Sequence, residues 1–231
     1  MSKNLLILGG SGALGSEIIT LFKNKGWKTI SIDFRDNTKS DISISITSTN
    51  ASELHRVEEI LKSTNTKADT IVCAAGGWVG GNAADEGYLG SVQKMIDMNL
   101  YSAFGTAFLG SKFLNENGLL VLTGANAALQ PTSFMIAYGA TKAATHHLIK
   151  SLAQPDSGLP NNSTTVGILP ITLDTPINRT AMPNSNFDDW TPLSDIANKL
   201  YEWSSIPESR PTGGSLLSII TKNKVTTYTP Q

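Results

Sequence analysis

The stretch Asn4-Leu-Leu-Ile-Leu-Gly-Gly-Ser-Gly-Ala-Leu-Gly15 determines the fold class. Its first five residues form an apolar run that stops at a glycine, which is typical of a buried parallel strand. The glycines Gly10, Gly12 and Gly15 then match the spacing Gly-x-Gly-x-x-Gly. Between a strand and a helix, this spacing leaves room for a pyrophosphate beside the helix N-terminus, whose amides and dipole attract anions. The stretch therefore predicts a dinucleotide-binding turn.

An acidic residue follows at the position that such a site requires. Asp33 closes a second predicted strand, 23 positions after Gly10. Its carboxylate can accept hydrogen bonds from a ribose diol and would repel a 2′-phosphate. Arg35 lies two residues further on, where it can stack on adenine or neutralise a 2′-phosphate. We therefore expect NADH as the preferred cofactor, with NADPH tolerated. The expected pyrophosphate site consists of Gly9, Gly10, Ser11, Gly12, Ala13, Leu14 and Gly15.

Strands and helices alternate along the chain. Predicted strands cover residues 4–8, 28–33, 69–74, 118–123, 164–169 and 215–221, with a further edge pairing over 224–228. Predicted helices cover residues 12–25, 51–62 (capped by Asn50 or Ser52), 91–114, 137–153 and 191–203. This alternation predicts an α/β fold: one Rossmann-type, doubly wound domain over residues 1–231, with a mostly parallel sheet of about seven strands and helices on both faces. Cofactor should bind at the carboxyl ends of the strands, where the strand order reverses.

Composition narrows the class of protein. With 231 residues and 40% hydrophobic content, the chain can bury a sizeable core without a linker. Its net charge of −1 gives no electrostatic reason to expect nucleic acid or an anionic membrane as partner. We expect no metal, because no His, Cys and carboxylate cluster has ligand spacing. The single Cys73, the absence of a long apolar run and a start that enters a strand without a signal peptide together favour the cytoplasm.

Tyr138 and Lys142 lie four residues apart in a predicted helix, so their side chains share one face. An ammonium near a phenol should lower the pKa of the tyrosine from its usual value of about 10. Tyr138 is therefore a candidate proton donor. The alternative is an interfacial tyrosine beside a solvated lysine. The N-terminal nucleotide pattern favours the catalytic interpretation.

Together these motifs resemble the short-chain dehydrogenases and, within them, the quinonoid dihydropteridine reductases. The resemblance covers nearly the whole chain. Its most specific segments are Ala75-Gly-Gly-Trp-Val-Gly-Gly-Asn-Ala83 and Ile168-Leu-Pro-Ile-Thr-Leu-Asp-Thr-Pro176. It implies reduction of a quinonoid dihydropteridine to a tetrahydropteridine with NADH, in a cytosolic homodimer built through a four-helix bundle. It also implies that Lys142 binds the nicotinamide ribose and that Asn99 holds its helix open and anchors a water.

Two positions depart from the wider dehydrogenase pattern. Where that pattern has a serine that polarises a carbonyl, this chain has Ala125, and Asn126 beside it is a candidate substrate contact. Where the pattern has Asn-Asn-Ala-Gly, this chain has Cys73-Ala74-Ala75-Gly76, whose last three residues are expected at the cofactor. Loss of the serine suits a quinonoid dihydropterin, because that electrophile has no ketone to polarise. Two alternatives stay open, namely a carbonyl or alcohol dehydrogenase and a non-catalytic NAD-binding regulator.

Two further segments are candidate ligand sites. Trp78 lies in a glycine-rich loop at the end of a strand, where its indole can stack on a planar heterocycle or simply pack as a core or lid residue. Pro170, Thr172, Leu173 and Thr175 follow a strand that should lie against the nicotinamide, although a proline-bounded turn with threonine caps is the alternative. Residues 178–189 are expected to form a substrate lid.

The remaining notable side chains carry structural expectations. Adjacent helical residues point in different directions, so His146 and His147 are expected at the surface or in an interface and not on a metal. Cys73 is expected to be a small buried hydrophobe. The tryptophans expected to pack in the core are Trp27, Trp190 and Trp203.

Overall fold

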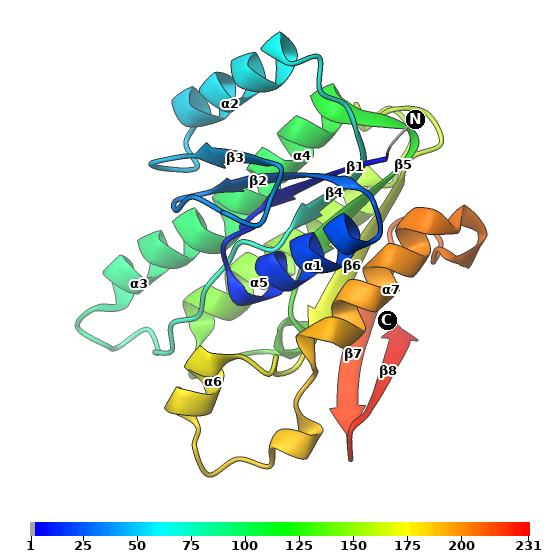
Figure 1. The fold of residues 1–231 in the computed structure, drawn as a ribbon. Helices are drawn as coiled ribbons and strands as arrows, with labels where there is room; N and C mark the ends of the chain where they lie inside the picture. The colour runs from blue at the N-terminus through cyan, green and yellow to red at the C-terminus, as the bar shows by residue number, and fades with distance from the viewer. Residues whose placement is uncertain (1–2) are drawn as a thin grey trace.

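One mixed sheet of eight strands runs through the computed structural model, which describes residues 3–231 (Figure 1). The strand order is β3-β2-β1-β4-β5-β6-β7-β8. Strands β1 to β7 pair in parallel, and β8 is antiparallel to β7. The bounds are β1 (Asn4–Leu8), β2 (Lys28–Asp33), β3 (Ile42–Ser45), β4 (Ala68–Cys73), β5 (Leu114–Thr123), β6 (Thr164–Pro170), β7 (Leu216–Lys222) and β8 (Val225–Pro230).

Helices cover both faces of this sheet, as the alternation of elements predicts. In Figure 1, α1 (Ala13–Asn24) and α7 (Leu193–Ser205) lie in front of the sheet. Behind it lie α4 (Ser102–Phe113) and α5 (Ile136–Leu152), with α2 (Ala51–Ser63) packed on α4. The helices on each face pack on the sheet and form a separate hydrophobic core there. Successive side chains of a strand point to opposite faces, so alternate strand residues contribute to the two cores. The Rossmann-type expectation is confirmed.

Two elements differ from the sequence-based expectation. The sheet has one strand more than the expected seven: β3 was not anticipated in its Ser/Thr-rich tract, although the alternation of isoleucine and serine over Ile42–Ser45 is a strand pattern. The expected single helix over 91–114 is wrong. The structure has α3 (Tyr88–Met95), a π-helical segment (Ile96–Tyr101) and then α4, and Leu114 already belongs to β5.

Several smaller expectations are confirmed. Asn50 caps α2, since its side chain accepts a hydrogen bond from the amide of Glu53 at 3.0 Å. Cys73 is a buried free thiol, and burial raises its pKa. The three tryptophans expected in the core, Trp27, Trp190 and Trp203, are buried.

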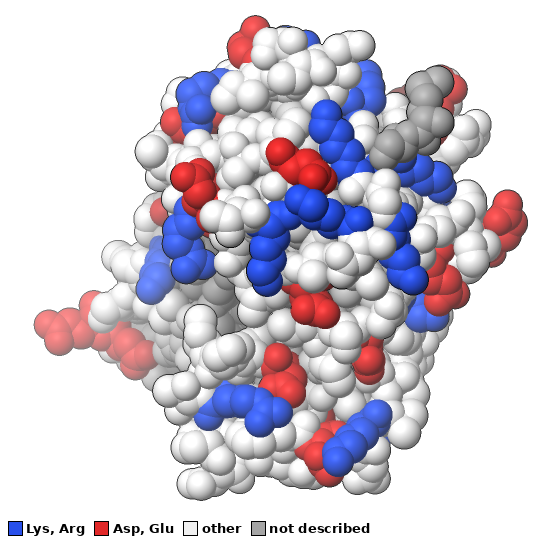
Figure 2. Space-filling model, in the orientation of Figure 1, with Lys and Arg blue, Asp and Glu red and all other residues white. Residues whose placement is uncertain are grey.

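The surface carries both signs of charge. On the face in Figure 2, Lys and Arg side chains alternate with Asp and Glu side chains, in keeping with the net charge of −1. Within residues 3–231, no helix combines the length and the hydropathy that a membrane crossing requires. No group of three or more His, Cys, Asp or Glu side chains in that part of the chain could hold a metal ion.

Candidate active site

A cavity opens at the carboxyl edge of the sheet, where the strand order reverses on either side of β1. Leu8, the last residue of β1, pairs with Ile32 of β2 and with Cys73 of β4. The cavity has a volume of about 190 Å³, and the surface in Figure 2 is hollowed between α1 and α3. The predicted cofactor residues in its wall are Gly9, Gly12, Asp33, Arg35, Ala74, Ala75 and Gly76.

The glycine loop at this edge has no room for side chains. Gly9 has a φ of +91°, and a Cβ there would lie 2.3 Å from the amide nitrogen of Ala75. A Cβ on Gly15 would lie 2.1 Å from the carbonyl oxygen of Gly9. The loop backbone therefore packs tightly against itself and against the residues that follow β4. Gly12 occupies the N-cap of α1 without a side-chain cap, which leaves the first-turn amides open to an anionic ligand.

Asp33 and Arg35 are tied to this loop through Ser11. The Ser11 amide donates to Asp33 Oδ2 at 2.9 Å, and the Arg35 guanidinium donates to the Ser11 carbonyl oxygen at 3.1 Å. The Ser11 hydroxyl in turn donates to the Arg35 carbonyl oxygen at 2.9 Å. The carboxylate and the guanidinium thus share one rim of the cavity, as their spacing in the sequence predicts.

Other contributors to this side of the site were missed by sequence reasoning. Asn37 is buried in the loop after β2, and its amide Nδ2 donates to the Gly10 carbonyl oxygen at 2.7 Å. No local pattern marks such residues, because they come from segments that meet only in the folded sheet. The missed polar and apolar lining residues are Phe34, Ile46, Thr49, Asp97, Met98 and Ser102.

The Tyr138 and Lys142 pair lies on α5, as expected, but its electrostatics differ from the expectation. Lys142 is 4% exposed, and its Nζ donates to the Thr123 carbonyl oxygen at 2.8 Å. The ammonium lies 6.0 Å from the centroid of the Tyr138 ring. Burial raises the pKa of Tyr138 to about 12 and lowers the pKa of Lys142 to about 8. The expected lowering of the Tyr138 pKa is wrong here, because desolvation of the phenol dominates.

Asn99 lies in the π-helical segment and links it by hydrogen bonds to two neighbouring parts of the fold. Its Oδ1 accepts from the Gly77 amide at 3.0 Å, and its Nδ2 donates to the Gly77 carbonyl oxygen at 3.1 Å. The same Nδ2 lies 3.4 Å from the hydroxyl of Thr141 on α5. The segment that carries Asn99 is thus held to the β4 exit and to α5 at once. π-helical turns of this kind occur often at functional sites.

Gly76 is the point where this network meets the cofactor cavity. A Cβ on Gly76 would lie 2.8 Å from Asn99 Oδ1 and 3.4 Å from Lys142 Nζ. The structure therefore brings Asn99 and Lys142 to the same end of the cavity as the β4 exit. The expected roles of Asn99 in anchoring a water and of Lys142 in binding the nicotinamide ribose stay predictions.

Trp78 lies outside the core. It is 63% exposed, and its indole Nε1 donates to the sulfur of Met135 at 3.3 Å. The two loops are also joined through the backbone, because the Gly81 amide donates to the Phe134 carbonyl oxygen at 2.7 Å. This exposure rules out core packing for Trp78, and its stacking on a substrate stays a prediction.

Contacts with β7 and with α5 hold the chain that leaves β5, and the expected substrate contact of Asn126 stays a prediction. Asn126 uses its amide Nδ2 to bond the hydroxyl of Ser218 on β7 at 2.7 Å, so that group is committed to the sheet. His146 is 7% exposed, and the expected surface or interface position is wrong for it. Its Nε2 accepts from the amide of Ala125 at 3.2 Å, whereas the neighbouring His147 is exposed.

In the segment after β6, the structure shows the proline-bounded turn with a threonine cap that was the alternative to a cofactor contact. The Thr175 hydroxyl accepts from the Asn178 amide at 3.2 Å and caps the short helix α6 (Pro176–Ala181). The Thr172 carbonyl oxygen accepts from the Thr191 amide at 2.8 Å. A cofactor contact of Pro170, Thr172, Leu173 or Thr175 stays a prediction.

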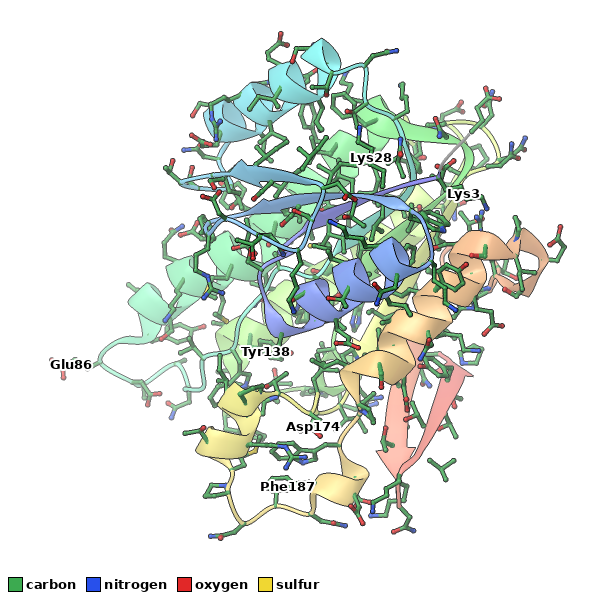
Figure 3. The ribbon with its side chains drawn as sticks, viewed as in Figure 1. Lys3, Lys28, Glu86, Tyr138, Asp174 and Phe187 are labelled. Carbon is green, nitrogen blue, oxygen red and sulfur yellow. The ribbon has the colours of Figure 1, made fainter. Side chains whose placement is uncertain are left out.

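Side chains of the expected lid contact each other and residues outside it. Arg179 donates from Nη2 to Asp174 Oδ2 at 2.8 Å, and its guanidinium lies 4.3 Å from the ring centroid of Phe187. Lys222 of β7 pairs with Asp189 at 2.5 Å. Figure 3 shows Asp174 and Phe187 below Tyr138 in that view, and Arg179 contacts both of them.

Comparison with known proteins identifies the family. Residues 3–186 match the short chain dehydrogenase family. The chain therefore belongs to the short-chain dehydrogenases and is an oxidoreductase. Over 229 residues, which are 99% of each chain, it is 61% identical to the dihydropteridine reductase of Dictyostelium discoideum. This similarity confirms the resemblance that the motifs indicate.

Solved structures show the same fold at low sequence identity. The short-chain dehydrogenase/reductase from Serratia marcescens aligns with a TM-score of 0.80 and 20% identity, over 96% of this chain and 98% of that chain. The aldohexose dehydrogenase of Thermoplasma acidophilum aligns with a TM-score of 0.77 and 20% identity, over 92% and 90%.

Membership of this family indicates a nicotinamide dinucleotide as cofactor, and the residues present fit it. Gly9, the uncapped start of α1 at Gly12 and Asp33 line one cavity, and Gly15 packs closely against the Gly9 carbonyl oxygen. They supply close backbone approach, amide donors for a pyrophosphate and an acceptor for a ribose diol.

Proposed function

We propose that this protein reduces quinonoid dihydropteridine to tetrahydropteridine with NADH, and with NADPH less well. The observation that carries the proposal is that Ala125 offers no hydrogen-bond donor to a substrate. This residue has no hydroxyl, and its amide is committed to His146. Position 125 therefore has no donor to polarise a ketone, while Tyr138 and Lys142 are both present. The 61% identity to a dihydropteridine reductase supports the same substrate class.

The chemistry suits an acceptor that is already activated. The bound cofactor supplies the hydride. A quinonoid dihydropterin gains aromaticity in its pyrimidine ring on reduction and needs a proton and correct orientation. Tyr138 is a phenol at neutral pH, as a tyrosine ordinarily is, and burial raises its pKa to about 12, so it holds a proton that the product requires. Orientation over the nicotinamide supplies much of the remaining acceleration.

The residues of the cavity have distinct roles in this proposal. The loop over 9–15 and the start of α1 bind the pyrophosphate. Asp33 binds the adenosine ribose, and Arg35 permits a 2′-phosphate. Lys142 binds the nicotinamide ribose, and Asn99 holds the helix at the β4 exit. Trp78 stacks on the pterin. The residues over 170–175 lie along the nicotinamide, and Asn126 borders the substrate.

We also propose a cytoplasmic homodimer that pairs α4 and α5 with the same helices of a second copy. Tyr101 and Phe104, just before and within α4, are about half exposed, and the small residues Ala140 and Ala143 are exposed on α5. Large exposed aromatic side chains beside small residues favour close helix packing. Light scattering after size exclusion should give twice the chain mass, and a monomer would contradict this arrangement.

One assay tests the function. NADH oxidation is followed while a tetrahydropterin is oxidised in situ to its quinonoid dihydro form. We expect turnover far above the uncatalysed rate. Its absence would exclude the proposal, and turnover of simple ketones would favour a carbonyl dehydrogenase. NADH binding without turnover of either substrate would favour a non-catalytic regulator.

A further inference from the structure

The buried face of α5 carries three functional side chains in succession. Tyr138, Lys142 and His146 occupy positions i, i+4 and i+8, which lie on one side of a helix. The first two belong to the proposed proton donor and cofactor clamp. The third reaches the chain that leaves β5, directly below the site.

Two of these side chains hold the same three-residue segment. Lys142 Nζ donates to the Thr123 carbonyl oxygen at 2.8 Å, and the Ala125 amide donates to His146 Nε2 at 3.2 Å. Between them, the Gly124 amide donates to the Ile168 carbonyl oxygen of β6 at 2.9 Å. The backbone over 123–125 is thus fixed by α5 from one side and by the sheet from the other.

Gly124 and His146 fit each other sterically. A Cβ on Gly124 would lie 2.5 Å from Nε2 and 2.6 Å from Cδ2 of the imidazole. The ring therefore packs directly against the glycine backbone. A larger residue at position 124 would push the imidazole away from the amide that it accepts.

We propose that His146 is a positioning residue of the active site, which fixes the backbone over 123–125 and thereby the carbonyl group that holds the Lys142 ammonium. Lys142 is almost fully buried, so it needs that carbonyl to keep its charge in a defined place. The same contact removes the Ala125 amide from the set of donors available to substrate. The inference rests on the proposed role of Lys142 in binding the nicotinamide ribose.

The chemistry of the imidazole supports this contact. The Ala125 N–H can only donate, so Nε2 must be unprotonated and the ring neutral. Burial, assisted by the charges of Lys142 and Lys150 on the same helix, lowers the pKa of His146 to about 4. The ring is therefore an acceptor at every pH at which the proposed enzyme would work.

Two substitutions that differ by one methylene test the inference. His146→Gln can place its amide oxygen near the position of Nε2, whereas His146→Asn is too short to reach the Ala125 amide. We expect the Asn variant to lose about 10- to 100-fold in kcat, as misplaced catalytic groups do. Its Kd for NADH, measured by fluorescence titration, should rise several-fold. The Gln variant should stay close to the wild type in both quantities.

The controls separate positioning from folding and from the proposed function. His147→Gln, at the exposed neighbouring position, should match the wild type. Circular dichroism melting should show both His146 variants folded at the assay temperature. If Asn and Gln variants bind NADH and turn over equally well, the inference is wrong. If wild-type protein turns over no pterin, the proposed function fails, and the NADH titrations still decide the role of His146.

Discussion

The two halves of the cleft are held together in different ways. On the nucleotide side, the glycine loop closes by steric contact within seven residues, Gly15 against Gly9, and distant side chains such as Asn37 then bond its backbone. On the catalytic side, the contacts are polar and distant in sequence: Lys142 with Thr123, and Asn99 with Gly77. The loop thus needs positions without side chains, whereas the catalytic side needs side chains that find buried partners. Substitutions should therefore affect the two sides differently.

The largest effect is expected from Gly15→Ala on the nucleotide side. Its Cβ would lie 2.1 Å from the Gly9 carbonyl oxygen, so the loop must distort where the pyrophosphate binds. We expect the Kd for NADH to rise roughly 100-fold or more, since close backbone approach is lost. Fluorescence titration measures it. Gly90→Ala, on α3 with nothing within 4 Å of the added Cβ, is the matched control.

Tyr138→Phe should have the next largest effect, on the catalytic side. Removing the phenolic proton donor should lower kcat about 100-fold, the usual contribution of general acid catalysis, with little change in the Kd for NADH. Steady-state kinetics with in situ quinonoid dihydropterin measure kcat, and the binding titration is the control. An unchanged kcat would show that solvent supplies the proton.

Trp78→Ala should act on substrate alone. The exposed indole is available for stacking, and its loss should raise the KM for the pterin about 10-fold, in line with the energy of an aromatic pair. The KM for NADH should not change. Leu89→Ala, another exposed apolar side chain from α3, is the control. Unaltered pterin kinetics would leave Trp78 without a role in the site.

Asp33→Ala should change cofactor selection more than catalysis. Without the carboxylate, the ribose diol loses an acceptor and a 2′-phosphate loses a repulsive charge. We expect the ratio of kcat/KM for NADH over NADPH to fall several-fold, by roughly 1 kcal/mol of discrimination. Arg35→Ala should move the ratio in the opposite direction. A ratio that Asp33→Ala leaves unchanged would assign selection to another group.

Arg179→Ala should have the smallest effect, because its contacts brace the lid and are half exposed. Loss of the bond to Asp174 and of the stacking on Phe187 should raise the KM for the pterin about threefold, as expected for exposed ion pairs and cation–π contacts. Arg179→Lys keeps the charge without the two-pronged geometry and should be intermediate. If Lys and Ala variants behave like wild type, the brace does not control substrate binding.

Sequence patterns predicted most of the fold but failed where distant contacts set the structure. The apolar runs and the glycine spacing located β1, β2 and α1 to within a residue or two. The continuous helix expected over 91–114 was wrong because Asn99 bonds the β4 exit and α5, and these contacts exist only after folding. β3 was missed although isoleucine and serine alternate over Ile42–Ser45, because the Ser/Thr-rich composition of the tract hid this short strand pattern.

Within the site, residue types were predictable and their electrostatic states were not. The spacing of Tyr138 and Lys142 placed both on one face of α5. It did not show that burial dominates their charge interaction, so that the pKa of Tyr138 is raised and not lowered. His146 was expected at the surface or in an interface, because nothing local in the His146-His147 pair indicates the Ala125 amide that His146 meets.

The sequence by itself determined the alternation of strands and helices, the glycine loop and the placement of Tyr138 and Lys142 on one helix face. Each of these follows from local sterics, from hydrophobic periodicity or from fixed spacing on one helix. Only the tertiary structure decided which groups are buried together: Lys142 with Thr123, His146 with Ala125, and Asn99 with Gly77. Desolvation and hydrogen bonding depend on neighbours brought from elsewhere in the chain, and they set the protonation states on which the proposed chemistry depends.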